Sequence, residues 1–154
     1  FFFFLLYRVS RAEYIKDLSG TRAKQYGCRW NRVGVAALYT SESRALAMLE
    51  LLVHFNSRAA IRNVYRFAVI EIDENRITGI PARLLPEDLY SYNNEYLWKI
   101  TDTYFLEKNC LAIRVPSVII GKEYNVILNP EHEDFPIIKI KDVEIATIDP
   151  RLAK

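Results

Sequence analysis

The amino-acid sequence predicts a single α+β domain with a mostly antiparallel sheet and flanking helices. Short β-rich runs recur along the chain, and one strongly apolar helical segment stands among them. No linker or internal repeat divides the sequence. The chain has 154 residues, of which 51% are hydrophobic, which suits one core in one domain over residues 1–154.

Runs rich in β-branched and aromatic residues, bounded by turn residues, predict the strands. The predicted strands are residues 5–9, 35–40, 64–72, 111–115, 124–128, 137–140 and 143–148. The apolar opening at residues 1–6 is far too short to span a membrane, so we interpret it as part of a buried first strand.

The clearest predicted helix covers residues 43–55. The preceding Thr40-Ser41-Glu42 offers an N-cap hydroxyl and an acidic first turn. Few polar residues interrupt the segment, so we expect a largely buried helix. A shorter helix is expected within residues 12–27 and a mixed helical stretch within 96–108. The apolar face of the clearest helix comprises Ala45, Leu46, Leu49, Leu52 and Val53.

Charge and cysteine content exclude several classes of protein. The 21 basic and 19 acidic residues are too balanced to indicate direct binding of nucleic acid. Cys28 and Cys110 form neither a disulfide framework nor a CxxC pair, and we interpret both as small buried hydrophobic residues. With only His54, expected in the core, and His132 beside them, no metal site is expected. A reduced, cytoplasmic location without a membrane anchor follows.

Glu50 is unusual because it interrupts the apolar run of the predicted helix. At helical spacing it falls at the edge of the apolar stripe. A carboxylate there is either solvated at the rim, which the pattern favours, or partly buried and paired. The functional alternative is a carboxylate held rigidly by a packed helix and aimed into a cleft.

Three further positions carry weaker signals. In Gly27-Cys28-Arg29-Trp30-Asn31, Arg29 is suited to grip an anion and Trp30 to stack on a ring, although a structural turn with a buried Trp is equally compatible. Tyr39, at a strand end, is typical of core packing. Ser117 follows Val115-Pro116 at another strand end without a Gly-x-Ser-x-Gly elbow, which favours a turn-forming Ser.

Taken in order, the motifs resemble the RES-domain family over roughly residues 7–152. Several motifs in sequence are far more specific than any one of them. The matching stretches are Tyr7-Arg8-Val9, Asp17-Leu18-Ser19-Gly20, residues 27–31, Leu38-Tyr39-Thr40, residues 47–54, residues 111–117, residues 125–132 and Asp149-Pro150-Arg151-Leu152.

The resemblance implies a fold similar to bacterial ADP-ribosylating toxins. It also implies destruction of NAD⁺, consumed as a substrate by hydrolysis or phosphorolysis, in the toxin of a type II toxin–antitoxin system. ADP-ribosylation of a protein is a variant activity in the family. The implied partner is an Xre-type antitoxin encoded beside the toxin.

The family is named for an Arg, a Glu and a Ser, which fall on Arg8, Glu50 and Ser117, and a Tyr of the same site falls on Tyr39. Cleavage of the nicotinamide–ribose bond develops positive charge on the ribose, so Glu50 would stabilise that charge. Arg8 would hold the dinucleotide through the planar donor fork of its guanidinium group. We therefore expect the Arg8→Lys protein to keep nearly the thermal midpoint of the parent. Tyr39 would wall in the nicotinamide, and Ser117 would position the ribose or Glu50.

Arg29 and Asn31 are expected to shape the same cleft. The sequence departs from the family at Cys28, usually a Gly, at Arg22, often a Gly, and at residues 101–104, where many members have Gly-Asp-Ala-Trp. A side chain in place of Gly near a ligand narrows a site. Two alternatives therefore stay open: an ADP-ribosyltransferase acting on a protein, and a catalytically silent domain that binds the antitoxin.

Overall fold

A computed structural model describes residues 2–55, 58–89 and 94–152. The strands form one seven-stranded sheet in the order β4-β5-β6-β2-β1-β3-β7. Every neighbouring pair is antiparallel except β4 and β5, which confirms the predicted α+β class. The strands are β1 (Phe3–Arg11), β2 (Leu38–Ser41), β3 (Tyr65–Asp73), β4 (Ile77–Gly79), β5 (Ala112–Pro116), β6 (Tyr124–Leu128) and β7 (Lys139–Ala146).

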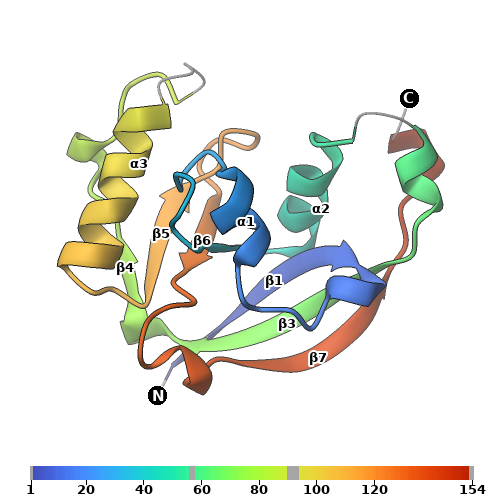
Figure 1. Ribbon diagram of the computed structural model, residues 1–154. Helices are drawn as coiled ribbons and strands as arrows, with labels where there is room; N and C mark the ends of the chain where they lie inside the picture. Colours follow the sequence, from blue (N-terminus) through green and yellow to red (C-terminus); the bar gives the residue numbers. More distant parts are fainter. Residues whose placement is uncertain (1, 56–57, 90–93, 153–154) are drawn as a thin grey trace.

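The sheet is bent into two halves that meet between β1 and β2. These strands pair at one register position, Tyr7 with Ser41, whereas β1 and β3 pair from Phe3 to Arg11. In Figure 1, β1, β3 and β7 run across the lower part of the molecule, and β5 and β6 stand nearly upright. The strands of one half therefore run at a steep angle to the strands of the other half.

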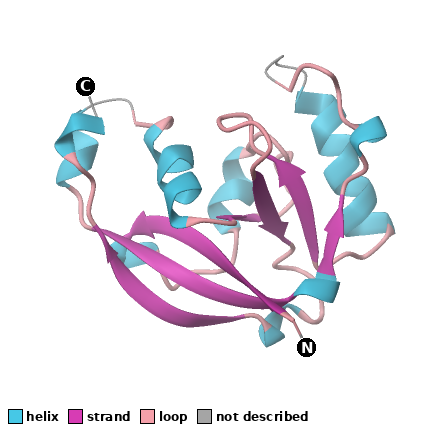
Figure 2. Cartoon of the chain, turned by 180° about the vertical axis from the view of Figure 1, so that it is seen from behind, coloured by secondary structure: helices cyan, strands magenta, loops and turns pink. Residues whose placement is uncertain are grey.

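Three α-helices lie on one side of the bent sheet (Figures 1 and 2). They are α1 (Thr21–Tyr26), α2 (Arg44–Leu52) and α3 (Asn94–Asp102), and a π-helical turn over Thr103–Glu107 extends α3. Within the described residues, no helix has the length and apolar character needed to cross a membrane.

Helix α2 begins later than the sequence predicts. Ser43 is the N-cap, and its side chain accepts from the backbone N–H of Leu46, so the expected acidic first turn is absent. Leu46 and Ala47 are buried, but Ala45 and Val53 are exposed. The prediction of a largely buried helix was wrong, because α2 packs on one side only, against β1 and β2.

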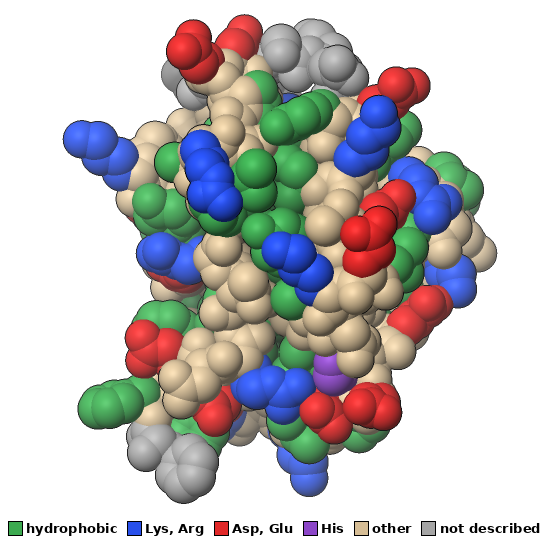
Figure 3. Space-filling view, turned by 90° about the vertical axis from the view of Figure 1, so that its left-hand side faces the viewer, with side chains coloured by type: hydrophobic (Ala, Val, Ile, Leu, Met, Phe, Trp, Pro, Cys, Tyr) green, Lys and Arg blue, Asp and Glu red, His purple; other side chains and the backbone are tan. Residues whose placement is uncertain are grey.

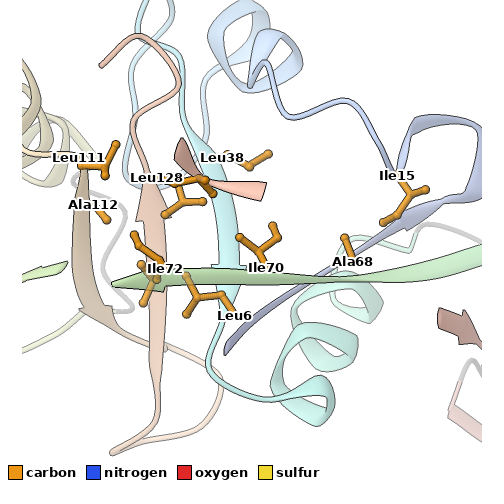
Figure 4. Close-up of a cluster of buried hydrophobic side chains, with 11 residues drawn as sticks. Leu6, Ile15, Leu38, Ala68, Ile70, Ile72, Leu111, Ala112 and Leu128 are labelled. Carbon is orange, nitrogen blue, oxygen red and sulfur yellow. The ribbon is translucent and has the colours of Figure 1, made fainter. Parts of the chain in front are cut away.

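The two faces of the sheet carry separate hydrophobic clusters. Paired residues of neighbouring strands share a face, and successive residues alternate. One face carries the cluster drawn in Figure 4, including Leu6, Ala68, Ile70 and Leu128. The opposite face carries two clusters, one beneath α3 and the other beneath α2.

Several strand predictions need correction. The start of β1 is not buried: Phe3, Phe4 and Leu5 are exposed, because β2 ends at Ser41, opposite Tyr7, and no strand lies beside them on that side. Phe1 lies outside the described residues. Residues 35–37 are buried but irregular, so β2 begins at residue 38. The two strands predicted within 137–148 are one strand, β7, preceded by a 3₁₀ turn.

Candidate functional site

Glu50 lies on α2 and is held by two side chains from the other half of the sheet. Its Oε1 accepts from Ser117 Oγ at 3.0 Å and from Asn125 Nδ2 at 2.7 Å. Glu50 is therefore half-buried and paired, and the solvated alternative that the pattern favoured was wrong. Its partners lie 67 and 75 residues further along the chain, so they do not show in the local pattern.

Ser117 follows β5 and is 5% exposed. Its Oγ accepts from the backbone N–H groups of Ile119 and Ile120 at 3.0 and 3.2 Å. Since both of these groups donate, the hydroxyl proton is directed to Glu50. The turn-forming role favoured by the sequence and a contact with Glu50 therefore coexist in one hydroxyl group.

Asn125 on β6 is the site residue that the sequence did not single out. Its amide donates to Glu50, and its Oδ1 accepts from Ser41 Oγ at 2.7 Å. Ser41 on β2 is buried and pairs with Asn125 across the strands. Asn125 lies within residues 125–132, one of the stretches that resemble the family, and this was the signal available.

Tyr39 and Asn31 form a second polar group on the same face of β2. The Tyr39 hydroxyl donates to Asn31 Oδ1 at 2.6 Å and accepts from the backbone N–H of Trp30 at 3.2 Å. Asn31 is completely buried and donates to the carbonyls of Ala23 and Val35. Burial raises the pKa of Tyr39, so its hydroxyl stays neutral. The two side chains fix the segment around residues 27–35 above the sheet.

Arg29 and Trp30 face different surroundings. Arg29 Nη1 donates to the carbonyl of Leu89 at 2.9 Å. Trp30 is 3% exposed and belongs to the cluster beneath α3, so it is a buried Trp of a structural turn.

Arg8 on β1 lies apart from the Glu50 group. Tyr7 shares a face with Ser41, so the neighbouring Arg8 points to the opposite face. Arg8 Nη1 donates to the carbonyl of Ile15 at 2.9 Å and more weakly to that of Tyr14 at 3.4 Å. Burial lowers the pKa of Arg8, and the charge of Asp17 opposes that shift. Among the described residues, no hydrogen bond or ion pair joins Arg8 to Glu50.

The structure thus brings together two of the four predicted catalytic residues, Glu50 and Ser117, by a direct contact. Tyr39 lies on β2, the strand next to β6, two residues before Ser41. A surface cavity of about 390 Å³ lies elsewhere and is lined by residues that include Arg32, Phe105 and Glu131. None of the six predicted site residues lines it.

Three residues that the sequence analysis discussed, Cys28, His54 and Arg22, are exposed in the structure. Cys28 is exposed, contrary to the prediction of a buried hydrophobic residue, and its backbone bonds to Asn31 and Trp98. His54 is exposed just beyond α2 and is not a core histidine. Arg22 is also exposed. The Cys28 thiol nevertheless lies close enough to Tyr39 to contribute to the raised pKa of that hydroxyl.

Charges of both signs are interspersed on one face of the molecule. On the face shown in Figure 3, Lys and Arg side chains alternate with Asp and Glu, and neither sign gathers in one area. This distribution agrees with the small formal net charge of +2.

Comparison with known proteins places the chain in one family. The family model described as RES domain matches residues 5–149. A protein of Photorhabdus laumondii named Toxin Res is 36% identical and covers 97% of both chains. A Toxin Res of Yersinia enterocolitica is 33% identical over 96% of this chain and 99% of its own. A Sphingobium protein named Prs ADP-ribosylating toxin is 34% identical over 90% of this chain and 88% of its own.

The fold also matches a solved structure. The toxin–antitoxin complex MbcT-MbcA of M. tuberculosis contains a chain that superposes with a TM-score of 0.75. The match covers 98% of this chain and 87% of that one at 18% identity, which supports the fold alone. Since the family model spans residues 5–149 and the three relatives align over at least nine-tenths of the chain, this protein belongs to the RES-domain family.

Proposed function

We propose that this chain is the toxin of a toxin–antitoxin pair and that it cleaves the nicotinamide–ribose bond of NAD⁺ in the cytoplasm. The observation that carries the proposal is the Glu50 carboxylate, which Ser117 and Asn125 hold from one side. The names of the relatives support a toxin, and the match to a toxin–antitoxin complex supports a protein partner.

Glu50 has the chemistry that this cleavage requires. As nicotinamide leaves, the ribose approaches an oxocarbenium ion, and a fixed carboxylate stabilises the developing positive charge. Water or inorganic phosphate then attacks the ribose, which gives hydrolysis or phosphorolysis. Two donors on Oε1 hold Glu50 in place, so little reorganisation is needed in the transition state.

Arg8 and Tyr39 are proposed to bind the dinucleotide. The role of Arg8 is proposed from the family resemblance, because Arg8 points to the face opposite Glu50, donates to neutral carbonyls and lies near the charge of Asp17. The Tyr39 hydroxyl is engaged by Asn31 and Trp30, so the ring supplies the surface that would wall in nicotinamide. Arg29 and Asn31 would shape the cleft by fixing the segment above β2.

Transfer of ADP-ribose to a protein is the second candidate activity. One relative carries the name Prs ADP-ribosylating toxin at 34% identity, which favours this variant. The same carboxylate would serve both activities, because both break the same bond and differ only in the group that attacks the ribose.

The proposed partner is an Xre-type antitoxin that occludes the NAD⁺ site. A site that binds an anionic dinucleotide through an Arg favours an antitoxin segment that presents a carboxylate. The test expresses the chain alone and together with its neighbouring gene. We expect growth arrest with NAD⁺ depletion from the chain alone, and normal growth with the partner. Normal growth and normal NAD⁺ with the chain alone, at an expression level confirmed by blotting, would contradict the toxin.

A further inference from the structure

A line of polar side chains connects the centre of the sheet to Glu50. Ser41 Oγ donates to Asn125 Oδ1 at 2.7 Å, and Asn125 Nδ2 donates to Glu50 Oε1 at 2.7 Å. Ser41 on β2 and Asn125 on β6 are direct cross-strand partners, and Ser41 is 3% exposed. The line therefore starts on paired strands and not in a loop, and its geometry is fixed by the sheet.

The hydrogen bonds allow only one orientation of the Asn125 amide. An ionised carboxylate accepts but cannot donate, so the amide nitrogen must face Glu50. The amide oxygen then faces Ser41, which has a proton to donate. The reversed amide would bring two acceptor oxygens together at Glu50, which is unfavourable.

The same oxygen of Glu50 receives the second bond. The Ser117 hydroxyl accepts from two backbone N–H groups, so its proton also points to Oε1. Within the described part of the chain, every recorded hydrogen bond to Glu50 falls on Oε1. Oε1 thus accepts both hydrogen bonds from the sheet side, while Oε2, on the other side of the carboxylate, points away from the two donors.

We infer that Asn125, oriented by Ser41, is a positioning residue that fixes Glu50 through Oε1 and leaves Oε2 to face the ribose. This inference rests on the proposed function, in which Glu50 stabilises the charge on the ribose. Asn125 acts through Glu50 and does not touch the substrate.

The substitution Asn125→Asp tests the inference because it keeps the size of the side chain and replaces the donor by a second carboxyl group. Two carboxyl groups at this distance share one proton, so they titrate as a coupled pair. We expect the acid limb of the kcat/KM profile for NAD⁺ cleavage to move up by about one pH unit or more. At neutral pH kcat should fall at least about tenfold with little change in KM, since the group acts on the transition state.

Asn129→Asp is the matched control. Asn129 lies just beyond the same strand and donates to the carbonyl of Cys110, so the change removes a similar hydrogen bond outside the site. We expect it to lower the thermal midpoint without moving the pH profile. An equal shift of the pH profile in both variants would show that loss of stability is the cause and would overturn the inference.

Ser41→Ala tests the line from its other end and keeps the inference testable should Asn125→Asp fail to fold. It removes the donor that orients the Asn125 amide. We expect kcat to fall several-fold with KM unchanged. Full parent activity of a folded Ser41→Ala protein would overturn the orienting role of Ser41.

Carboxyl ¹³C NMR separates failure of this inference from failure of the proposed function, because it needs no substrate. In Asn125→Asp we expect the two neighbouring carboxyl groups to titrate in two linked steps, as a coupled pair does. If Asn125→Asp shows linked titration and the parent chain leaves NAD⁺ intact, the positioning role is supported and the proposed activity is refuted. If the two carboxyl groups of Asn125→Asp titrate independently and the variant cleaves NAD⁺ like the parent, the positioning role alone is refuted.

Discussion

Glu50 shows how an acidic residue is accommodated on an otherwise apolar helix. Its helix packs on the sheet at one side, and Glu50 sits at the edge of that contact, where Ser117 and Asn125 reach it. Removing a carboxylate from water is unfavourable unless hydrogen bonds replace the lost hydration. The two donors provide that replacement and hold the carboxylate in place.

Glu50→Gln should abolish most of the activity while the fold is kept. The amide oxygen of Gln can accept from both Ser117 and Asn125, so the local contacts survive without the negative charge. We expect kcat for NAD⁺ cleavage to fall at least about a hundredfold, the usual effect of losing one electrostatic group in a site. The measurement is nicotinamide release, with circular dichroism to confirm folding.

Glu131→Gln is the control for charge alone, since Glu131 forms an exposed ion pair with Lys24. Its activity should equal that of the parent. Parent-like turnover in Glu50→Gln would remove Glu50 from the mechanism.

Arg8→Lys should affect both stability and binding. The expectation of little change in stability is untested, and the hydrogen bonds from Arg8 Nη1 to the carbonyls of Tyr14 and Ile15 lead us to expect a loss instead. Losing such bonds costs about 1–3 kcal/mol, and each kcal/mol lowers the thermal midpoint by about 2–4 °C. NAD⁺ affinity, measured by calorimetry, should also fall because Lys lacks the planar fork.

Arg151→Lys serves as the comparison, because Arg151 is exposed and, within the described residues, its side chain pairs with the nearby Asp149 alone. Arg151→Lys should change neither the thermal midpoint nor the NAD⁺ affinity. If Arg8→Lys lowers the thermal midpoint but leaves NAD⁺ affinity unchanged, Arg8 supports the fold and does not bind the dinucleotide.

The sequence located Glu50 and Ser117 as candidate residues, but it did not locate what holds them. Neither residue stands alone as a strong signal, and only their order among other motifs singled them out. Asn125 and Ser41 were missed because their contacts cross strands, and strand pairing is not encoded by local spacing. The same limit led the pattern at Glu50 to favour a solvated carboxylate.

Among the elements, α2 sets the position of Glu50 along the sheet. Ser43 begins the helix by accepting from the backbone N–H of Leu46, and Ala47 and Leu51 pack on the cluster beneath it. The sequence predicted the helix itself, but three consecutive hydroxyl or acidic residues before it left the cap ambiguous. The structure resolves the ambiguity because Thr40 and Ser41 bond across β2 to β6.

Ser43→Ala should destabilise the protein by about 1 kcal/mol, the usual cost of losing an N-cap side chain. Urea unfolding followed by circular dichroism measures this change. Ser10→Ala is the control, since the Ser10 hydroxyl bonds only to the adjacent carbonyl of Arg11 in an exposed setting. A loss in Ser43→Ala no larger than in the control would show that Ser43 does not cap α2.

The sequence predicted strands correctly where their apolar pattern is strong. It failed where tertiary contacts determine whether a strand forms and where it ends. The prediction for β6 matched its bounds, residues 124–128. The short parallel β4 was missed, because three residues beside a Gly-Ile-Pro break carry no periodic signal. The two strands expected near the end of the chain merge into β7, which tolerates an irregularity opposite Val69 and Ile70.

At the level of the whole molecule, the site lies where the two halves of the sheet meet. Tyr7 and Ser41 form the single paired position between β1 and β2, and Ser41 is also the first member of the line that leads to Glu50. The helix that carries Glu50 packs against β1 and β2, one strand from each half, while Asn125 and Ser117 belong to the half that contains β2. The geometry of the carboxylate therefore depends on how the halves are joined.

Incubation of the purified chain with NAD⁺, with and without inorganic phosphate, tests the central claim most directly. We predict release of nicotinamide, with ADP-ribose as the second product in hydrolysis and its phosphorylated form in phosphorolysis. Glu50→Gln should release at least about a hundredfold less. Labelled protein in place of free ADP-ribose would assign the transferase variant. Intact NAD⁺ after incubation with the folded parent chain, in both conditions, would contradict the claim.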